Sequence, residues 1–340
     1  MRRLTVLFLL TFACVASALS RQRKIELTET FHPPLKSGSA DLFVPLPLKN
    51  LTYQKILNET YHSNATWVKK VNIGFDHGRY NVRVLYAHWN NAVKPWLRLR
   101  EVLWLSDRKG VPGKFNRYFL RSTPHIQTNG IVKKTAVNVT CNAKTPDKKA
   151  LAIYNWIVKN TFRNPKTRGC GMGDAKSTLT VDDLGGKCAD INTLFVALAR
   201  SSGIPARDAF GLRVAPSYVS KSLGKVGDVS KAEHCRAEYY SVKHKAWYPA
   251  DAADVRKVIL DEHLKLSNPH VQHVVSRLFN RWEGNWVEFN FARNVRLPNG
   301  YTVSYLMYPQ LFQGHNLISS GINPAHEGYT FTSKVLKVIQ

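Results

Sequence analysis

The sequence predicts an α+β fold whose middle part packs helices on an antiparallel sheet. Three observations support this: strand-like alternation before residue 135, helix-like apolar spacing at 147–160 and from residue 188, and strand-like alternation after these helices. Apolar residues make up 44% and charged residues 21% of the chain, a composition that excludes disorder. Because 340 residues exceed the ~250–300 residues of a single core, we expect two or three packed units.

Residues 1–20 have the pattern of a signal peptide. An apolar stretch without charge separates Arg3 from Arg21, and it ends in the small residues Ala16-Ser17-Ala18. An uncleaved membrane anchor is the alternative, but the uncharged stretch is short for one. We therefore expect a secreted or periplasmic protein with no integral membrane segment after leader cleavage.

Residues 21–135 predict a β-sandwich-like domain. Strand patterns are present at 40–47, where prolines stop the strand, and at 81–86 and 97–104. Four tryptophans lie among basic residues in this part of the chain: Trp67, Trp89, Trp96 and Trp104. A nucleic-acid stacking surface is one interpretation, but aromatic filling of a β-sandwich is the one we favour.

The charge of the chain predicts anionic partners. Lys and Arg number 49 against 23 Asp and Glu, a formal net charge of +26. Nucleic acid, anionic lipid and envelope polymers all meet this requirement. An exported chain meets envelope polymers more often, so we expect a protein or peptide substrate that is acidic or associated with the cell envelope, and we do not expect nucleic acid.

Residues 136–260 contain the candidate catalytic groups. A helix is predicted at 147–160, a looser stretch rich in Gly and Thr at 163–186, and a second helix that begins at Cys188 and ends before Gly203. A helix N-terminus stabilises a thiolate, and its free N–H groups can bind a developing oxyanion. Cys188 is therefore a candidate nucleophile, with a buried structural cysteine as the alternative.

Partners for such a nucleophile follow on two predicted strands. Strand alternation places His234, Arg236 and Glu238 on one face and Cys235 on the other, and Asp251 ends the next strand. A single histidine on a strand is more often structural. A cysteine on a helix followed by His and Asp on adjacent strands is, however, the order of papain-like catalytic groups.

These segments resemble the transglutaminase-like superfamily over about residues 145–255. The helix that begins at Cys188 is similar to the nucleophile helix of that family, His234 falls in its second motif, and Ala250-Asp251 match its third. The resemblance implies a papain-like transglutaminase core with a catalytic triad of cysteine, histidine and aspartate at these positions.

Two departures from the family pattern concern specificity. Arg236 stands where tryptophan is usual, and Ala252 stands where proline is common. We expect Lys187, Arg236 and Glu238 to contact the substrate, with Arg236 binding an acidic group. An internal ion pair of Arg236 with Glu238 or another acid is the alternative.

Residues 261–340 are similar to the C-terminal extension of some exported bacterial members. A short helix at about 270–280 and later strands are expected to cover the catalytic domain. Trp286 and Tyr308 either line the cleft or pack in the core. The polar surroundings of Cys141 and Cys170 favour a disulfide between them, while Cys235 is expected to stay unpaired.

The function that we predict is cysteine acyl transfer on a carboxamide or peptide carbonyl through a thioester, with transglutaminase, deamidase or peptidase outcomes. No calcium-loop pattern is present, so we expect no metal and no cofactor. The alternative is a non-catalytic protein that uses the same fold to bind an anionic envelope polymer.

Overall fold

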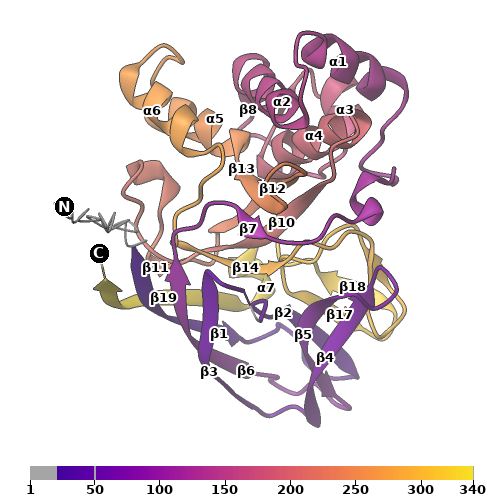
Figure 1. Ribbon diagram of the computed structural model, residues 1–340. Helices are drawn as coiled ribbons and strands as arrows, with labels where there is room; N and C mark the ends of the chain where they lie inside the picture. Colours follow the sequence, from indigo (N-terminus) through magenta and orange to yellow (C-terminus); the bar gives the residue numbers. More distant parts are fainter. Residues whose placement is uncertain (1–20, 50, 340) are drawn as a thin grey trace, which may run out of the picture.

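A computed structural model describes residues 21–49 and 51–339 (Figure 1). The predicted signal peptide at 1–20 lies outside these residues. Within the described part of the chain, no helix has the length and apolar character needed to cross a membrane.

Two five-stranded sheets form the lower part of the molecule in Figure 1. The first has the order β11 (Gly227–Asp228), β19 (Tyr329–Ile339), β1 (Gln22–Phe31), β6 (Leu97–Ser106) and β3 (Gln54–Ser63). The second has the order β18 (Asn316–Ser319), β17 (Gln310–Gln313), β2 (Ala40–Pro45), β5 (Tyr80–Trp89) and β4 (Trp67–Phe75). Strict alternation along β1 turns Ile25, Leu27 and Phe31 into the core. Of the four N-terminal tryptophans, Trp89 is buried in this core and the other three are half-buried.

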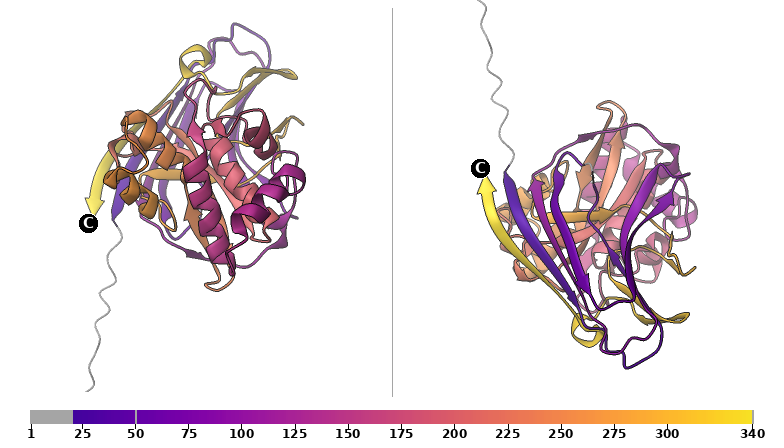
Figure 2. Two further views of the ribbon diagram at one scale, coloured as in Figure 1. Left: turned by 90° about the horizontal axis from the view of Figure 1, so that it is seen from above. Right: turned by 90° about the horizontal axis from the view of Figure 1, so that it is seen from below.

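A third five-stranded sheet carries the helices. Its order is β14 (Trp286–Asn290), β10 (Ala206–Arg213), β12 (Glu233–Ser241), β13 (Ala246–Ala250) and β7 (Val111–Pro112). The helix α4 (Cys188–Ser201) packs on β10 and β12 and is buried along its whole length. The helices around it are α1 (Gly130–Thr140), α2 (Pro146–Asn160), α3 (Ala175–Thr180) and α5 (Ala252–Asp261). Seen from above in Figure 2, these helices cover one face of the sheet.

The remaining elements are short or lie at the periphery. They are η1 (Arg117–Leu120), β8 (Phe162–Arg163), β9 (Gly185–Gly186), η2 (Lys221–Leu223), α6 (Pro269–Arg277), β15 (Val295–Arg296), β16 (Thr302–Val303) and α7 (Pro324–Glu327). The predicted α+β class, with an N-terminal β region and C-terminal strands, is confirmed.

Residues 261–340 reach further than the expected cover of residues 136–260: β14 pairs with β10, but later strands join other sheets. The last strand, β19, pairs along the whole of β1, and β17 pairs with β2, so C-terminal strands complete both N-terminal sheets. In the opposite direction, β7 from the N-terminal part extends the third sheet by pairing with β13. The physical reason is that open sheet edges require partners, and a local sequence pattern does not say which distant strand supplies them. Figure 2 shows both ends of the described chain side by side.

Candidate active site

Cys188 is the first residue of α4, and only 1% of its surface is exposed. Gly186, with a φ of 151°, turns the chain into the helix. A Cβ at Gly186 would lie 2.5 Å from the Cβ of Asp190, so a side chain there does not fit. The Oδ2 atom of Asp190 accepts a hydrogen bond of 2.9 Å from the backbone N–H of Lys187 and thereby caps the helix.

A glycine-rich loop, residues 169–173, lies against this helix start. The backbone N–H of Ala189 donates to the carbonyl of Cys170 at 2.9 Å, and the N–H of Gly173 donates to Oδ1 of Asp190 at 2.9 Å. Gly171 has a φ of +94°, and a Cβ there would lie 1.9 Å from Oδ2 of Asp190. The sequence pattern indicated only a loose stretch at this point, although Asp190 stands at the capping-box spacing from Lys187.

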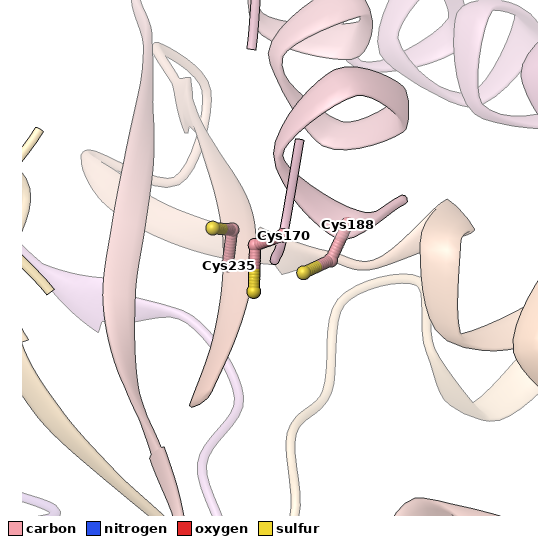
Figure 3. A group of neighbouring side chains, drawn as sticks. All are labelled: Cys170, Cys188 and Cys235. Atoms are coloured by element: carbon pink, nitrogen blue, oxygen red, sulfur yellow. The ribbon is translucent and has the colours of Figure 1, made fainter. Parts of the chain in front are cut away.

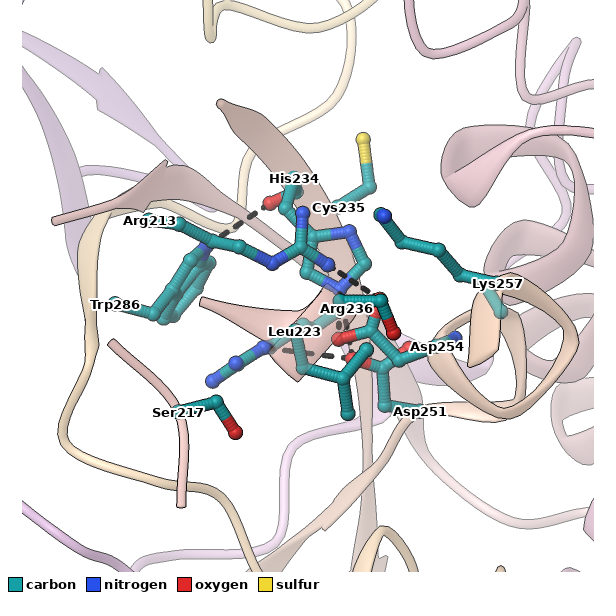
Figure 4. A network of polar contacts seen from close by, with 12 residues as sticks. Arg213, Ser217, Leu223, His234, Cys235, Arg236, Asp251, Asp254, Lys257 and Trp286 are labelled. Carbon is teal, nitrogen blue, oxygen red and sulfur yellow. Dashed lines mark hydrogen bonds and ion pairs between the residues drawn. The ribbon is translucent and has the colours of Figure 1, made fainter. Parts of the chain in front are cut away.

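His234, on β12, faces two carboxylates (Figure 4). Its Nε2 atom lies 2.7 Å from Oδ2 of Asp251 and 3.2 Å from Oδ2 of Asp254. All three side chains are buried, with at most 1% exposed. Among the described residues, the Nδ1 atom of His234 has no hydrogen-bond partner. This ring nitrogen is therefore available to a proton donor or acceptor on the other side of the imidazole.

Asp251 is fixed by its position between β13 and α5. It is the N-cap of α5, where its Oδ1 atom accepts from the backbone N–H of Asp254 at 3.1 Å. The same Oδ1 atom accepts from Nδ2 of Asn192 at 2.9 Å, and this amide also donates to the carbonyl of Cys235 at 2.9 Å. Sequence reasoning missed Asn192, although its place four residues after Cys188 puts both on one face of α4.

Two arginines complete the environment of the histidine. Arg213 pairs with Oδ1 of Asp254, and the Nε atom of Arg236 lies 3.4 Å from Oδ2 of Asp251. The guanidinium of Arg236 also lies over the rings of Trp282 and Trp286, 5.0 and 4.6 Å from their centroids. The network thus places two positive charges against two carboxylates in a site closed to water.

Burial and charge shift the pKa values of the histidine and the cysteine in opposite directions. Burial and Arg213 lower the pKa of His234, but Asp254 and Asp251 outweigh them and raise it to about 9. Burial alone would raise the pKa of Cys188, yet the neighbouring thiols and His234 hold it well below its usual range. Both shifts favour a thiolate–imidazolium pair at neutral pH.

The expected substrate contacts of Arg236 and Glu238 are wrong. Arg236 is only 3% exposed and pairs with Asp251, so its ion pair is internal, as the alternative interpretation had it, but not with Glu238. Glu238 is fully buried and pairs with Arg108 and Arg207. Buried ion pairs of this kind cannot exchange partners with a substrate without a large desolvation cost.

Lys187 is half-buried and lines a cavity of about 250 Å³ beside the candidate nucleophile. Tyr308 and Cys170 line the same cavity. Trp286 is 5% exposed and donates through Nε1 to the carbonyl of His234 at 3.1 Å. Tyr308 thus borders open space, whereas Trp286 packs behind the histidine.

The expected disulfide between Cys141 and Cys170 is also wrong. Both residues are free, Cys141 is exposed at the end of α1, and Cys170 is 6% exposed. The Cys170 thiol lies with those of Cys188 and Cys235 (Figure 3). The backbone hydrogen bond from Ala189 to Cys170 holds the loop 169–173 against the start of α4. The composition of the loop does not predict this hydrogen bond.

The chain is similar to known proteins in both sequence and fold. Residues 133–252 match the sequence model of the transglutaminase-like superfamily, and the chain belongs to this superfamily. It is 35% identical to an uncharacterized protein from Haemophilus influenzae over 345 residues, which cover 92% of this chain and 91% of the relative. The fold is similar to the crystal structure of a candidate cysteine protease from Cytophaga hutchinsonii, with a TM-score of 0.53 and 16% identity over 93% of this chain and 98% of the other. Family and fold support a cysteine enzyme in general terms.

Proposed function

We propose that the protein is an extracytoplasmic cysteine acyl-transfer enzyme with Cys188 as nucleophile, His234 as acid and base, and Asp251 as the residue that orients the histidine. The observation that carries this proposal is the buried contact of 2.7 Å between His234 and Asp251 next to a cysteine whose pKa is lowered. A buried imidazole that is charged at neutral pH is costly unless an opposite charge compensates it.

The reaction begins with attack of the Cys188 thiolate on the carbonyl carbon of a carboxamide or peptide. The N–H group of Ala189 is already bound to Cys170, so the N–H of Cys188, at the free end of α4, is the donor that we assign to the oxyanion. As the tetrahedral intermediate collapses, the C–N bond breaks and His234 Nδ1 gives its proton to the leaving amine. The resulting thioester is then cleaved by an amine or by water, whose proton returns to His234.

We assign substrate entry to the cavity that Lys187 and Tyr308 line, because Lys187 directly precedes Cys188 in the chain. Because Cys188 is 1% exposed, the loop 169–173 must move locally when a carbonyl enters. We expect a protein or peptide substrate, acidic or associated with the envelope, since the chain carries a net charge of +26.

The test is mass spectrometry of the protein mixed with a glutamine-containing peptide and a primary amine. Ligation, deamidation and cleavage each give a distinct product mass. Each product should be absent with Cys188→Ser and present with the control Cys141→Ser, which alters an exposed cysteine. If no product forms while an anionic envelope polymer binds to the protein, the non-catalytic interpretation replaces this one.

A further inference from the structure

Three thiols meet at the start of α4 (Figure 3). Cys170 comes from the loop 169–173, Cys188 from α4 and Cys235 from β12, and their sulfur atoms all lie within 4.8 Å of one another. All three residues are buried, with 6%, 1% and 0% of their surface exposed. Acyl transfer requires one nucleophilic thiol, so the other two take no covalent part in the proposed reaction.

The surroundings of this cluster supply a fourth sulfur atom. The Sγ atom of Cys235 lies 3.9 Å from the Sδ atom of Met307, and both side chains are fully buried. The Cys170 thiol is held by a weak hydrogen bond of 3.5 Å to the carbonyl of Glu233. The potential donors are thus three thiols and one thioether.

We propose that Cys170, Cys188 and Cys235 form a binding site for one soft monovalent cation, Cu(I), with Met307 beside it. Sulfur atoms that each lie about 2.3 Å from a central ion in a trigonal plane are about 4.0 Å apart. The observed separations, all within 4.8 Å, require only side-chain adjustment to reach this geometry. Thiolate and thioether ligands select Cu(I), whereas a zinc site favours four thiolate, imidazole or carboxylate ligands.

Charge and access are compatible with such a site. Two arginines carry positive charge near the cluster: Arg213 pairs with Asp254, and Arg293 pairs with Asp208. Their charges act on Cys188 and Cys235, respectively, and partly offset the negative charge that the thiols gain when they release protons to bind a metal. Of the three cysteines, Cys170 lines the cavity of about 250 Å³, so an ion that enters this cavity meets the cluster at Cys170.

A bound ion would occupy the sulfur of Cys188 and block acyl transfer. This consequence rests on the proposed function, but the binding itself does not. Measurement of metal binding therefore separates the two proposals: a chain that binds Cu(I) and turns over no substrate leaves the metal site standing, and an active chain that binds no Cu(I) leaves the enzyme standing.

The experiment is an anaerobic titration of the reduced protein with Cu(I) against a chromogenic Cu(I) chelator, with X-ray absorption to identify the ligands. We expect one Cu(I) per chain with sulfur-only coordination. Cys170→Ser and Cys235→Ser should each weaken binding by more than about 100-fold, the upper range for loss of an outer partner of a metal site. Cys141→Ser should bind as the unaltered chain does.

Circular dichroism and thermal melting establish that each variant is folded. Met307→Leu keeps all three thiols and serves if a serine variant fails to fold; we expect it to weaken Cu(I) binding by about 10-fold. Unchanged affinity in folded Cys170→Ser and Cys235→Ser, stronger binding of Zn²⁺ than of Cu(I), or no Cu(I) bound would each overturn the proposal.

Discussion

At the residue scale, one imidazole is held between two carboxylates, and each carboxylate is held by an arginine. The contacts of His234 with Asp251 and Asp254 fix its Nε2 atom and leave Nδ1 directed away from them. Such an arrangement stabilises the charged imidazole, and it acts on the thiol through that charge.

We expect iodoacetamide at pH ~6 to label Cys188 ahead of Cys170 and Cys235, because an unperturbed thiol with a pKa of about 8.5 is barely ionised at this pH. The pKa of Cys188 is lowered, while that of Cys170 is raised by the Cys188 thiol and that of Cys235 by burial. His234→Ala should slow the labelling of Cys188 by about 10-fold or more, as peptide mapping would measure. His244→Ala, on the exposed turn after β12, is the control. Equal labelling in the wild type and His234→Ala would contradict the ion pair.

Asp254 is a positioning residue that the sequence analysis did not single out. Asp254→Asn removes one of the two carboxylates that raise the pKa of His234 and leaves the charge of Arg213, which lowers it. The pKa of the imidazole should therefore be about one to three units lower in the variant than the value of about 9 in the unaltered chain. The pKa of the ring, measured by NMR titration, and the pKa at which kcat/KM falls on the alkaline side should decrease by the same amount. Asp261→Asn, at the exposed end of the same helix, should move neither.

Arg236 serves the carboxylate network, not the substrate. Because Arg236 is buried against Asp251 and two tryptophans, Arg236→Leu should lower the free energy of unfolding by about 3 kcal/mol, the cost of breaking a buried pair. We expect kcat/KM to fall by the same factor for acidic and neutral peptides. A loss confined to acidic peptides would restore the substrate-binding interpretation.

Residue types and spacing alone identified Cys188, His234 and Asp251 as candidates, because a helix start and two strand patterns are local signals. They did not identify Asn192, Asp254, Arg213 or Cys170 as neighbours of these groups. Asn192 and Asp254 lie near Cys188 and Asp251 in sequence. The sequence does not say which helix face packs against the sheet, so it does not say that these two side chains face the site. Arg213 reaches the site from β10, the neighbour of β12 in the sheet, and Cys170 reaches it from the loop 169–173.

At the element scale, the start of α4 is held by a loop that has no regular structure. Asp190 accepts from the backbone of both Lys187 and Gly173, so one carboxylate joins the helix cap to the loop 169–173. Burial raises the pKa of Asp190, while these two hydrogen bonds oppose the rise. The loop therefore depends on glycines that leave room for this side chain.

Gly171→Ala should destabilise the protein more than an alanine at an open glycine does. Gly171 has a φ of +94°, and a Cβ there would lie 1.9 Å from Oδ2 of Asp190. Backbone strain of about 1–3 kcal/mol is then added to a steric conflict of about 1–3 kcal/mol. The control is Gly300→Ala, whose φ is +86° and whose Cβ would meet nothing within 4 Å, so it carries the strain alone. Urea unfolding of both variants measures this difference. Equal losses in the free energy of unfolding would show that the loop 169–173 adjusts to the added Cβ without cost.

The predicted helices at 147–160 and from Cys188 correspond to α2 and α4, because their apolar spacing matches the helical period. The fold of the loop 169–173 was not predictable in the same way. Its conformation is set by hydrogen bonds to Ala189 and Asp190, which lie about twenty residues away.

At the scale of the whole molecule, strands from the two ends of the chain pair with each other. The pairing of β1 with β19 and of β2 with β17 joins residues separated by more than 260 positions, which no periodicity encodes. The strand character of β2, β5 and β6 was predicted, but their partners were not. We therefore infer that the helix-bearing sheet and the other two five-stranded sheets fold as one cooperative assembly, so that the free energy of unfolding depends on all three sheets.

Glu29 makes this assembly sensitive to pH. It lies on the buried face of β1, is 1% exposed, and neither of its carboxylate oxygens has a hydrogen-bond partner among the described residues. Burial, with Glu101 and Glu233 nearby, raises its pKa well above the usual value. A carboxyl group whose pKa is raised on folding stabilises the fold below its unfolded pKa of about 4.3, and this contribution is lost as the pH rises through the folded pKa.

Glu29→Gln removes the charge that the fold disfavours and keeps the shape of the side chain. The variant should therefore have a higher free energy of unfolding than the wild type at pH ~8, and the difference should shrink towards zero as the pH falls to ~3, where Glu29 is neutral in both the folded and the unfolded state. Chemical unfolding at a series of pH values measures this difference. Glu26→Gln, on the outer face of the same strand and paired with Arg100, lacks the burial and should show no such gain. A gain in Glu29→Gln that does not depend on pH would mean that the gain does not come from the ionisation of Glu29. A loss at pH ~8 would mean that Glu29 is ionised and paired in the folded protein, and either result would remove β1 as the origin of the pH sensitivity.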